Sequence, residues 1–120
     1  MIAGNWKMHK TVSEAVALAE DIVMETNGTL NEVVIFPPFT ALETVADAID
    51  GKHVGYGAQD LHWEDKGAFT GAVSGAMIAD ICAEYVLVGH SERRTIFGEN
   101  EKIVASKIIA AYRNGLKPML

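Results

Sequence analysis

The sequence contains a single cysteine, Cys82, among its 120 residues. One cysteine cannot form a disulfide within the chain or supply a cysteine-based metal cluster, so neither of these holds the fold together. Cys82 lies in an apolar helical pattern, and we expect it to be a small buried hydrophobic residue rather than a nucleophile. Cysteine usage of this kind is typical of a reducing compartment, and we expect the protein to be cytoplasmic.

Basic residues are also scarce, with 10 Lys and Arg against 16 Asp and Glu and a formal net charge of -6. Only Arg93 and Arg94 are adjacent, so the sequence offers no basic patch for nucleic acid. No apolar run approaches the length of a membrane span, and the N-terminus lacks the basic-then-apolar layout of a signal peptide. We therefore expect the protein to bind neither nucleic acid nor membranes.

Several motifs with known chemistry are missing as well. No spacing of Cys and His is typical of a zinc site, and neither a Walker loop nor the G-x-G-x-x-G pattern occurs. His53 and His62 have no matching partners in the sequence, and we expect them to be surface or strand residues. These observations predict no metal site.

The sequence does contain a regular alternation of short apolar runs and longer helical patterns. Two capping-box pairs, Thr11 with Glu14 and Thr40 with Glu43, predict helix starts, and Ser74 is a further N-cap candidate. The helices are expected at 11–26, 40–49, 74–84 and 100–113, and the strands at 2–6, 33–36, 53–58, 85–88 and 116–120.

Strands that alternate with helices through short connections predict an α/β fold with a parallel sheet, here a single domain over residues 1–120. Two architectures fit this order of elements: a small doubly wound sheet, or part of an eight-stranded α/β barrel. Length alone favours the doubly wound sheet, because a complete barrel needs roughly 200 residues or more. Residues 59–73 form a long polar segment, QDLHWEDKGAFTGAV, and such a loop is usually functional or part of an interface.

Polar residues follow the predicted strands, where parallel α/β proteins place their chemistry. Asn5 and Lys7 follow the first strand, and His90 and Glu92 follow the fourth. Each has an ordinary alternative: a solvated lysine, a structural histidine, or a glutamate paired with Arg93 and Arg94. For the two arginines the ion-pair role is the favoured interpretation. Together they predict an enzyme that acts on a small, oxygen-rich anion. His90 follows a glycine and is expected to open a short helical turn, which would keep its ring neutral and able to donate a hydrogen bond.

Three motifs, AGNWKM at 3–8, GAQD…KGAFTG at 57–71 and VGHSERR at 88–94, resemble those of triosephosphate isomerases. The resemblance runs in order along the whole chain. It implies the (β/α)8 barrel fold, of which this chain would form a half barrel of about four βα units and the start of a fifth strand. It also implies a glycolytic and gluconeogenic isomerase without metal or cofactor, which interconverts dihydroxyacetone phosphate and glyceraldehyde 3-phosphate through an enediolate.

The resemblance also implies roles for individual residues. Asn5 would orient the substrate, Lys7 would place positive charge beside its oxygens and phosphate, and His90 would polarise the carbonyl and shuttle protons. Ser91 and Glu92 would support Lys7 and the surrounding loop, so that Glu92 is not the catalytic base.

Self-association is a further implication. The family's third loop inserts into a partner subunit, and here Phe69, Thr70 and Gly71 would make that contact. Ala72 stands where a glutamate is common in FTGE, which removes a carboxylate that would pair across the interface with an arginine such as Arg93. The open edges of a half barrel are also expected to associate.

The family's catalytic base, a glutamate after the sixth strand, and its phosphate-binding loops have no counterpart in these 120 residues. The substrate site would then be incomplete, and we expect negligible isomerase activity from the chain alone. Two alternatives remain open: one half of a split enzyme that needs a C-terminal partner, and a non-catalytic assembly module. A doubly wound phosphate-binding domain ranks last, because the glycine-rich phosphate loop is missing.

Overall fold

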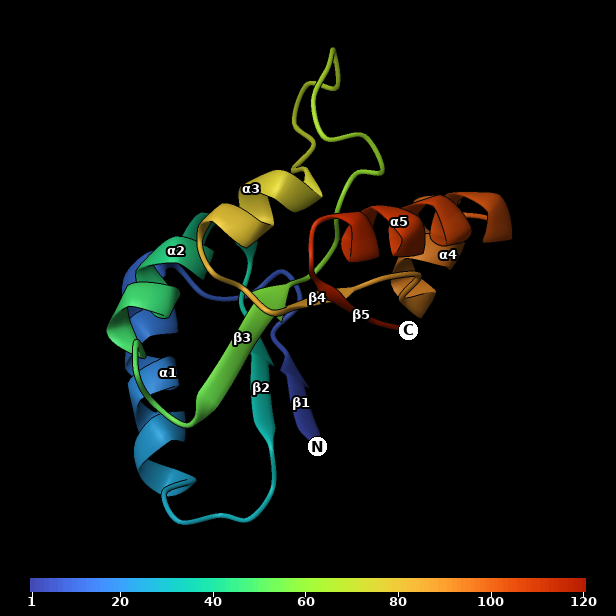
Figure 1. Cartoon of the computed structure of the whole chain (residues 1–120). Helices are drawn as coiled ribbons and strands as arrows, with labels where there is room; N and C mark the ends of the chain where they lie inside the picture. Colours follow the sequence, from blue (N-terminus) through green and yellow to red (C-terminus); the bar gives the residue numbers. More distant parts are fainter. The chain divides into compact units, whose positions relative to one another are not determined.

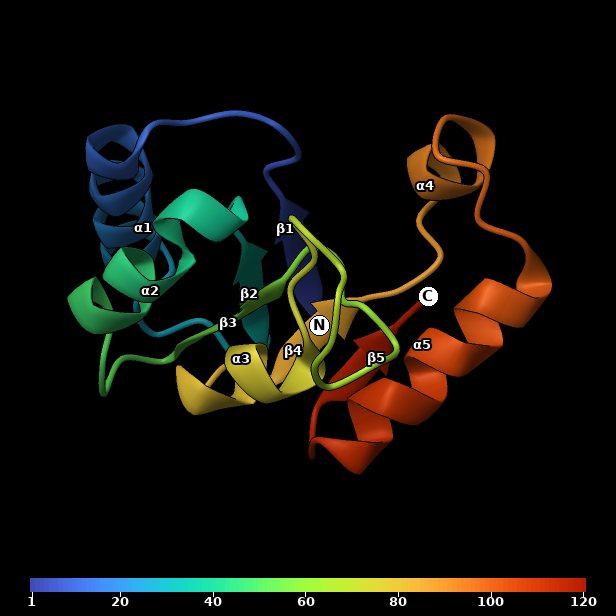
Figure 2. The same ribbon diagram turned by 90° about the horizontal axis from the view of Figure 1, so that it is seen from above.

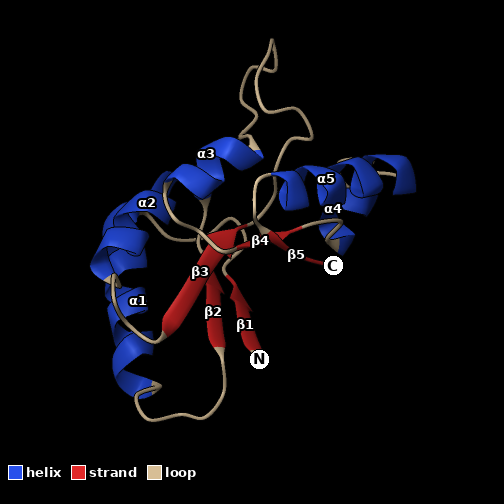
Figure 3. Ribbon diagram, viewed as in Figure 1, coloured by secondary structure: helices blue, strands red, loops and turns tan.

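The computed structural model describes residues 1–120 and divides them into two compact units, Met1–Gln59 and Asp60–Leu120 (Figure 1). Each unit alternates strands with helices, as predicted (Figure 3). None of the helices combines the length and the apolar character that are needed to cross a lipid bilayer. The first unit contains β1 (Ile2–Asn5), α1 (Val12–Glu25), β2 (Val33–Phe36), α2 (Phe39–Ala48) and β3 (Val54–Ala58), and the second contains α3 (Gly75–Asp80), β4 (Tyr85–Leu87), α4 (Ser91–Thr95), α5 (Glu101–Arg113) and β5 (Lys117–Met119).

The first unit is a parallel three-stranded sheet with α1 and α2 on one side of it (Figure 2). In the centre of the sheet Ile35 lies opposite Gly4 on β1 and Tyr56 on β3. All four residues of β2 are buried, which explains the continuous apolar run VVIF. The core between sheet and helices consists of Ala15 and Ala19 from α1, Ala41, Val45 and Ile49 from α2 and its end, and Val33, Ile35 and Val54 from the strands.

The predicted start of α1 is confirmed, whereas the predicted start of α2 is wrong. Glu14 Oε2 accepts hydrogen bonds from the backbone N–H of Thr11 at 2.8 Å and from its hydroxyl at 2.9 Å. Both hydrogen bonds lower the pKa of Glu14, and the bond from the backbone N–H has the larger effect. In α2 the N-cap is Pro38, and Thr40 lies inside the first turn, where it cannot cap the helix. Pro38 has the extended ψ of 152° and the φ of -63° of an N-cap residue, so the helix begins directly after the proline pair that ends β2.

The second unit contains the parallel pair β4 and β5, in which Tyr85 lies opposite Lys117. The helix expected from residue 100 is confirmed as α5, and Asn100 caps it by accepting a hydrogen bond from the N–H of Ile103 at 3.0 Å. The helical spacing predicts Ile103, Val104, Ile108 and Ala111 on one side of this helix, but Ile103 and Ile108 are only partly buried. The fully buried residues of this helix are Val104, Lys107, Ala110 and Ala111.

Cys82 is exposed, so the prediction that it is a buried core residue is wrong. The helix that was expected to reach Glu84 ends at Asp80, and Cys82 then takes a left-handed backbone conformation with φ 57°. This turn swings the cysteine outwards, while Ala83 and Tyr85 beyond it are buried at 6% and 5% exposure. The apolar pattern identified the buried neighbours but not the turn between them.

Replacing Cys82 with glycine is expected to stabilise the chain by about 1 kcal/mol, because the left-handed conformation places a Cβ atom too close to the backbone. Urea unfolding followed by circular dichroism measures this change. Cys82→Ala is the matched control, since it removes the thiol but keeps the Cβ atom, and it should leave the stability nearly unchanged. Equal effects of the two substitutions would show that the thiol, and not the backbone, is responsible.

Candidate active site

Asn5 and Lys7 lie in the first unit, at and just beyond the carboxyl end of β1. Lys7 has φ 53°, a left-handed conformation that costs a non-glycine residue about 1–3 kcal/mol and is found mainly at functional sites. Two side chains hold this backbone. Asn5 Oδ1 accepts a hydrogen bond from the Lys7 N–H at 2.9 Å, and Gln59 Nε2 donates one to the Lys7 carbonyl at 2.9 Å.

Gln59 is a residue to which the sequence assigned no role. Its Nε2 also donates to the carbonyl of Phe36 at 2.8 Å, so one amide ties the loop after β1 to the end of β2. Gln59 directly follows β3, and the carboxyl ends of neighbouring parallel strands lie at the same edge of a sheet. A polar residue at that position was therefore the signal available in the sequence.

His90 lies in the second unit as the N-cap of the short helix α4, which confirms the predicted helical turn. Its Nδ1 accepts a hydrogen bond from the backbone N–H of Glu92 at 3.2 Å. Because that nitrogen is the acceptor, the proton of the neutral ring is on Nε2, which can donate to a ligand. Ser91 and Glu92 form the first turn of α4, and Glu92 Oε2 lies 3.5 Å from His90 Nδ1.

The backbone before His90 needs a glycine. Gly89 has φ 66°, and a Cβ atom there would lie 3.0 Å from Arg94 Nη2 and from both methyl groups of Val104. Arg94 reinforces this turn by donating from Nε to the Gly89 carbonyl at 2.7 Å, and it also pairs with Glu101. The sequence had favoured an ion-pair role for Arg94, and this role is confirmed with a different carboxylate.

Arg93 belongs to a network of four charged side chains in the second unit. Its guanidinium lies 2.5 Å from Glu99 and 3.1 Å from Asp60, and Lys107 Nζ lies 2.5 Å from each of the same carboxylates. The side chains of Lys107 and Glu99 are only 4% and 5% exposed. Glu99 Oε2 is buried and has no hydrogen-bond partner. The ion-pair role favoured for Arg93 is thus confirmed, with Glu99 and Asp60 as its partners. The sequence gave no sign of Lys107, which sits within an otherwise amphipathic helical pattern.

Burial and pairing act in opposite directions on the two carboxyls of the network. Burial raises the pKa of Asp60, and the nearby Lys107 and Arg93 only partly oppose it. Burial would also raise the pKa of Glu99, but the hydrogen bonds from Lys107 and Arg93 outweigh it and leave that pKa lowered. The same two cations therefore leave the pKa of Glu99 below its ordinary value and that of Asp60 above it. No group of three or more His, Cys, Asp or Glu side chains is arranged to bind a metal ion.

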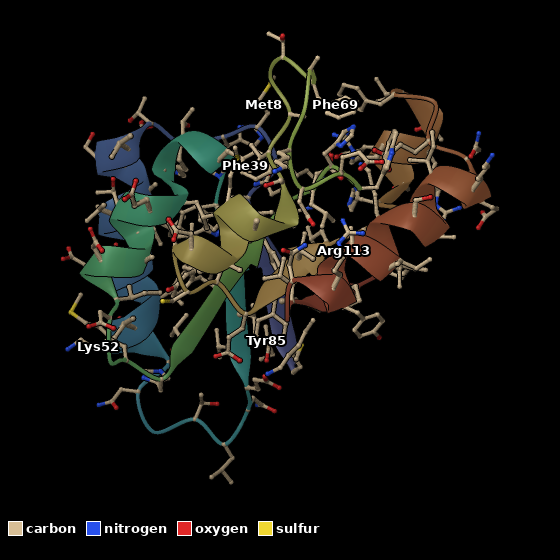
Figure 4. All side chains as sticks on the ribbon, turned by 45° about the horizontal axis from the view of Figure 1, so that its top comes forward. Met8, Phe39, Lys52, Phe69, Tyr85 and Arg113 are labelled. Atoms are coloured by element: carbon tan, nitrogen blue, oxygen red, sulfur yellow. The ribbon has the colours of Figure 1, made fainter.

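The predicted interface residues Phe69, Thr70 and Gly71 lie on the long loop, residues 59–73, which extends away from α3 and α5 (Figures 1 and 4). Phe69 is 43% exposed, and Thr70 and Gly71 are exposed as well. Gly67 lets the ring of Phe69 fold back, because a Cβ atom there would lie 2.7 Å from that ring. The loop thus presents one aromatic ring and small residues at its projecting part.

Comparison with known proteins decides the family. The family model of triosephosphate isomerase matches residues 1–120, the whole chain. The chain belongs to the triosephosphate isomerase family. Triosephosphate isomerases from Moorella thermoacetica and Symbiobacterium thermophilum are 50% and 49% identical to it over 120 and 121 residues. The chain spans about half the length of these curated relatives, 48% and 47% respectively.

A solved structure supports the same assignment. The crystal structure of triosephosphate isomerase from Bartonella henselae matches with a TM-score of 0.89 and 38% sequence identity. The match covers 98% of this chain and 48% of that one. The predicted fold class, the parallel βα units of a half TIM barrel, is thereby confirmed, and the doubly wound alternative is wrong. Length alone had favoured that alternative because 120 residues are too few for a complete barrel. Chain length does not distinguish a small complete sheet from half of a barrel.

Proposed function

We propose that this chain carries the Asn5, Lys7 and His90 part of a triosephosphate isomerase site, which interconverts dihydroxyacetone phosphate and glyceraldehyde 3-phosphate. The observation that carries the proposal is the family match across every residue of the chain. It is supported by the positions of Asn5 and Lys7 after β1 and of His90 after β4, because active sites of this fold lie at the carboxyl ends of strands.

In the proposed reaction, a proton leaves one carbon of the triose phosphate and negative charge develops on the carbonyl oxygen. The Nε2–H of His90 would donate to that oxygen, and the ammonium of Lys7 would stabilise the charge of the enediolate and phosphate. Asn5 would orient the substrate while it holds the Lys7 backbone through the 2.9 Å hydrogen bond. Ser91 and Glu92, in the first turn of α4, would support this arrangement.

The base expected for proton abstraction and the phosphate-binding loops have no counterpart among these 120 residues. A general acid–base group contributes about 10²–10⁴-fold to rate. We therefore propose that these residues alone isomerise triose phosphates negligibly, and that activity requires the rest of the family's barrel.

A second copy of the chain is the proposed partner. Phe69, Thr70 and Gly71 would enter it, and the edges of β1 and β5, each with a strand neighbour on one side only, would associate as well. The proposed location is the cytoplasm, where the family's glycolytic reaction takes place.

A chimera tests the proposed activity. This chain would be joined to the part of the Moorella thermoacetica relative that lies beyond the matched residues, and purified from a host without its own isomerase. We expect turnover of glyceraldehyde 3-phosphate by the chimera and no measurable turnover by residues 1–120. An inactive but folded chimera would overturn the proposal, and self-association of residues 1–120 in that case would favour the assembly module.

A further inference from the structure

We propose that the C-terminal end of α5 holds the long loop in the shape that a second copy binds, with Arg113 and Asn114 as positioning residues. This inference rests on the self-association proposed above and adds the element that controls it. The interface residues lie on the projecting part of the loop. The residues proposed to control it lie at the end of α5, and Arg113 contacts Trp63 of the loop from 50 positions further along the chain.

The first observation is a clamp on Asp65. Arg113 donates from Nε to Asp65 Oδ2 and from Nη2 to Asp65 Oδ1, both at 3.0 Å, which is the two-pronged geometry that guanidinium and carboxylate favour. Arg113 Nη2 also donates to the Trp63 carbonyl at 2.8 Å, and Asn114 Nδ2 donates to Asp65 Oδ1 at 2.8 Å. Four hydrogen bonds from two adjacent residues thus converge on residues 63–65 of the loop.

The clamp is itself fixed in place. Asn114 Nδ2 donates a further hydrogen bond to the Ala110 carbonyl of α5 at 2.9 Å. A Cβ atom at Gly75, the first residue of α3, would lie 2.7 Å from Asn114 Nδ2, so the asparagine fits closely against a second helix. Figure 4 shows Arg113 at this end of α5. The clamp therefore joins the loop to α5 and to the start of α3.

The second observation is a set of contacts within the loop itself, made by His62. The His62 N–H donates to the Val73 carbonyl at 2.8 Å, which closes the neck of the loop. The His62 ring lies 4.2 Å from the ring of Trp63 and 4.1 Å from that of Phe69, and its Nδ1 accepts from the Glu64 N–H at 3.0 Å. Phe69 is thus connected through His62 and Trp63 to the backbone that Arg113 holds.

These contacts predict an effect on association and not on global stability. The side chains of Arg113 and Asp65 are 45% and 42% exposed, and ion pairs at such positions contribute little to folding. A loop that is already ordered loses less conformational entropy when a partner binds, and this lowers the dissociation constant. The hydrogen bonds from Arg113 and Asn114 lower the pKa of Asp65, so its carboxylate is the form that the clamp holds.

Sedimentation equilibrium of the chain tests the inference. Arg113→Ala is expected to raise the dissociation constant of self-association at least tenfold, with an unchanged unfolding midpoint. Asp65→Ala should act similarly, and the double variant should raise the dissociation constant by less than the product of the two single effects, because both substitutions remove the same Arg113–Asp65 pair. Lys102→Ala, an exposed cation at the other end of α5, is the matched control and should change neither quantity.

Phe69→Asp separates this inference from the proposed self-association. If Phe69→Asp weakens association but Arg113→Ala does not, the clamp is overturned and the loop interface stands. If Phe69→Asp has no effect, or the wild-type chain stays monomeric, both fall. Trypsin cleavage after Lys66 provides a direct readout of loop order, and the inference requires faster cleavage in Arg113→Ala than in Lys102→Ala.

Discussion

Replacing Lys107 with methionine is expected to destabilise the chain by about 3–5 kcal/mol, the loss typical when one member of a buried ion pair is removed. Lys107 is 3% exposed and lies 2.5 Å from both Asp60 and Glu99. Methionine would fill most of its volume but would leave two carboxylates with Arg93 as their remaining cation. Because Glu99 Oε2 already lacks a partner, Arg93 Nε would be the remaining hydrogen-bond donor to this carboxylate.

Urea or thermal unfolding followed by circular dichroism measures this effect. Lys102→Met is the matched control, since it makes the same substitution at an exposed position of the same helix. The control should change stability by less than about 0.5 kcal/mol, as is usual for surface substitutions. A similarly small effect of Lys107→Met would mean that the network contributes no net stability once its burial is taken into account.

Replacing His90 with asparagine in the active chimera is expected to lower kcat by about 10²–10⁴-fold, the range for a group that transfers or shares a proton in the transition state. Asparagine can occupy the N-cap position and accept the bond that His90 Nδ1 receives from Glu92, so α4 should persist. Asparagine has no ring nitrogen that can give a proton to the substrate oxygen and take it back, as His90 Nε2 would. The loss should therefore appear in kcat more than in KM.

His53→Asn is the control for this variant. His53 is exposed in the first unit, and its Nε2 lies 2.8 Å from the Thr26 hydroxyl. A steady-state isomerase assay should find the control within about twofold of the chimera, since a surface substitution distant from the chemistry removes no transition-state contact. Equal losses in the two variants, or full activity of His90→Asn, would remove His90 from the proposed mechanism.

The sequence predicted most of the local structure because the signals were local. The apolar run VVIF became the buried strand β2, and Thr11 and Ser74 became N-caps. The helix expected from residue 100 became α5. The failures came where one residue changed the geometry of its neighbours. Pro38 displaced the expected cap at Thr40, and the left-handed turn at Cys82 ended α3 four residues before the predicted position, at Asp80.

For the candidate site, the motifs identified Asn5, Lys7 and His90, and their local geometry agrees with the expected positions at strand ends. Gln59 was missed because its two acceptors, the carbonyls of Lys7 and Phe36, are 52 and 23 positions away in sequence. The polar residue after β3 was visible in the sequence, but a backbone carbonyl leaves no trace in residue identity, so the partners of Gln59 were not.

By itself, the sequence determined the order of strands and helices, the family, and which side chains stand at the strand ends, since all of these depend on residue type and spacing. Only the tertiary structure decided which charges meet. Lys107 looked like one more charged residue in a helix, yet it lies between Asp60 and Glu99, 47 and 8 positions away. Arg113 likewise reaches Asp65 across 48 positions. The physical reason is that ion pairs act through space: folding brings distant side chains within 3 Å, and that proximity is not encoded in any local pattern.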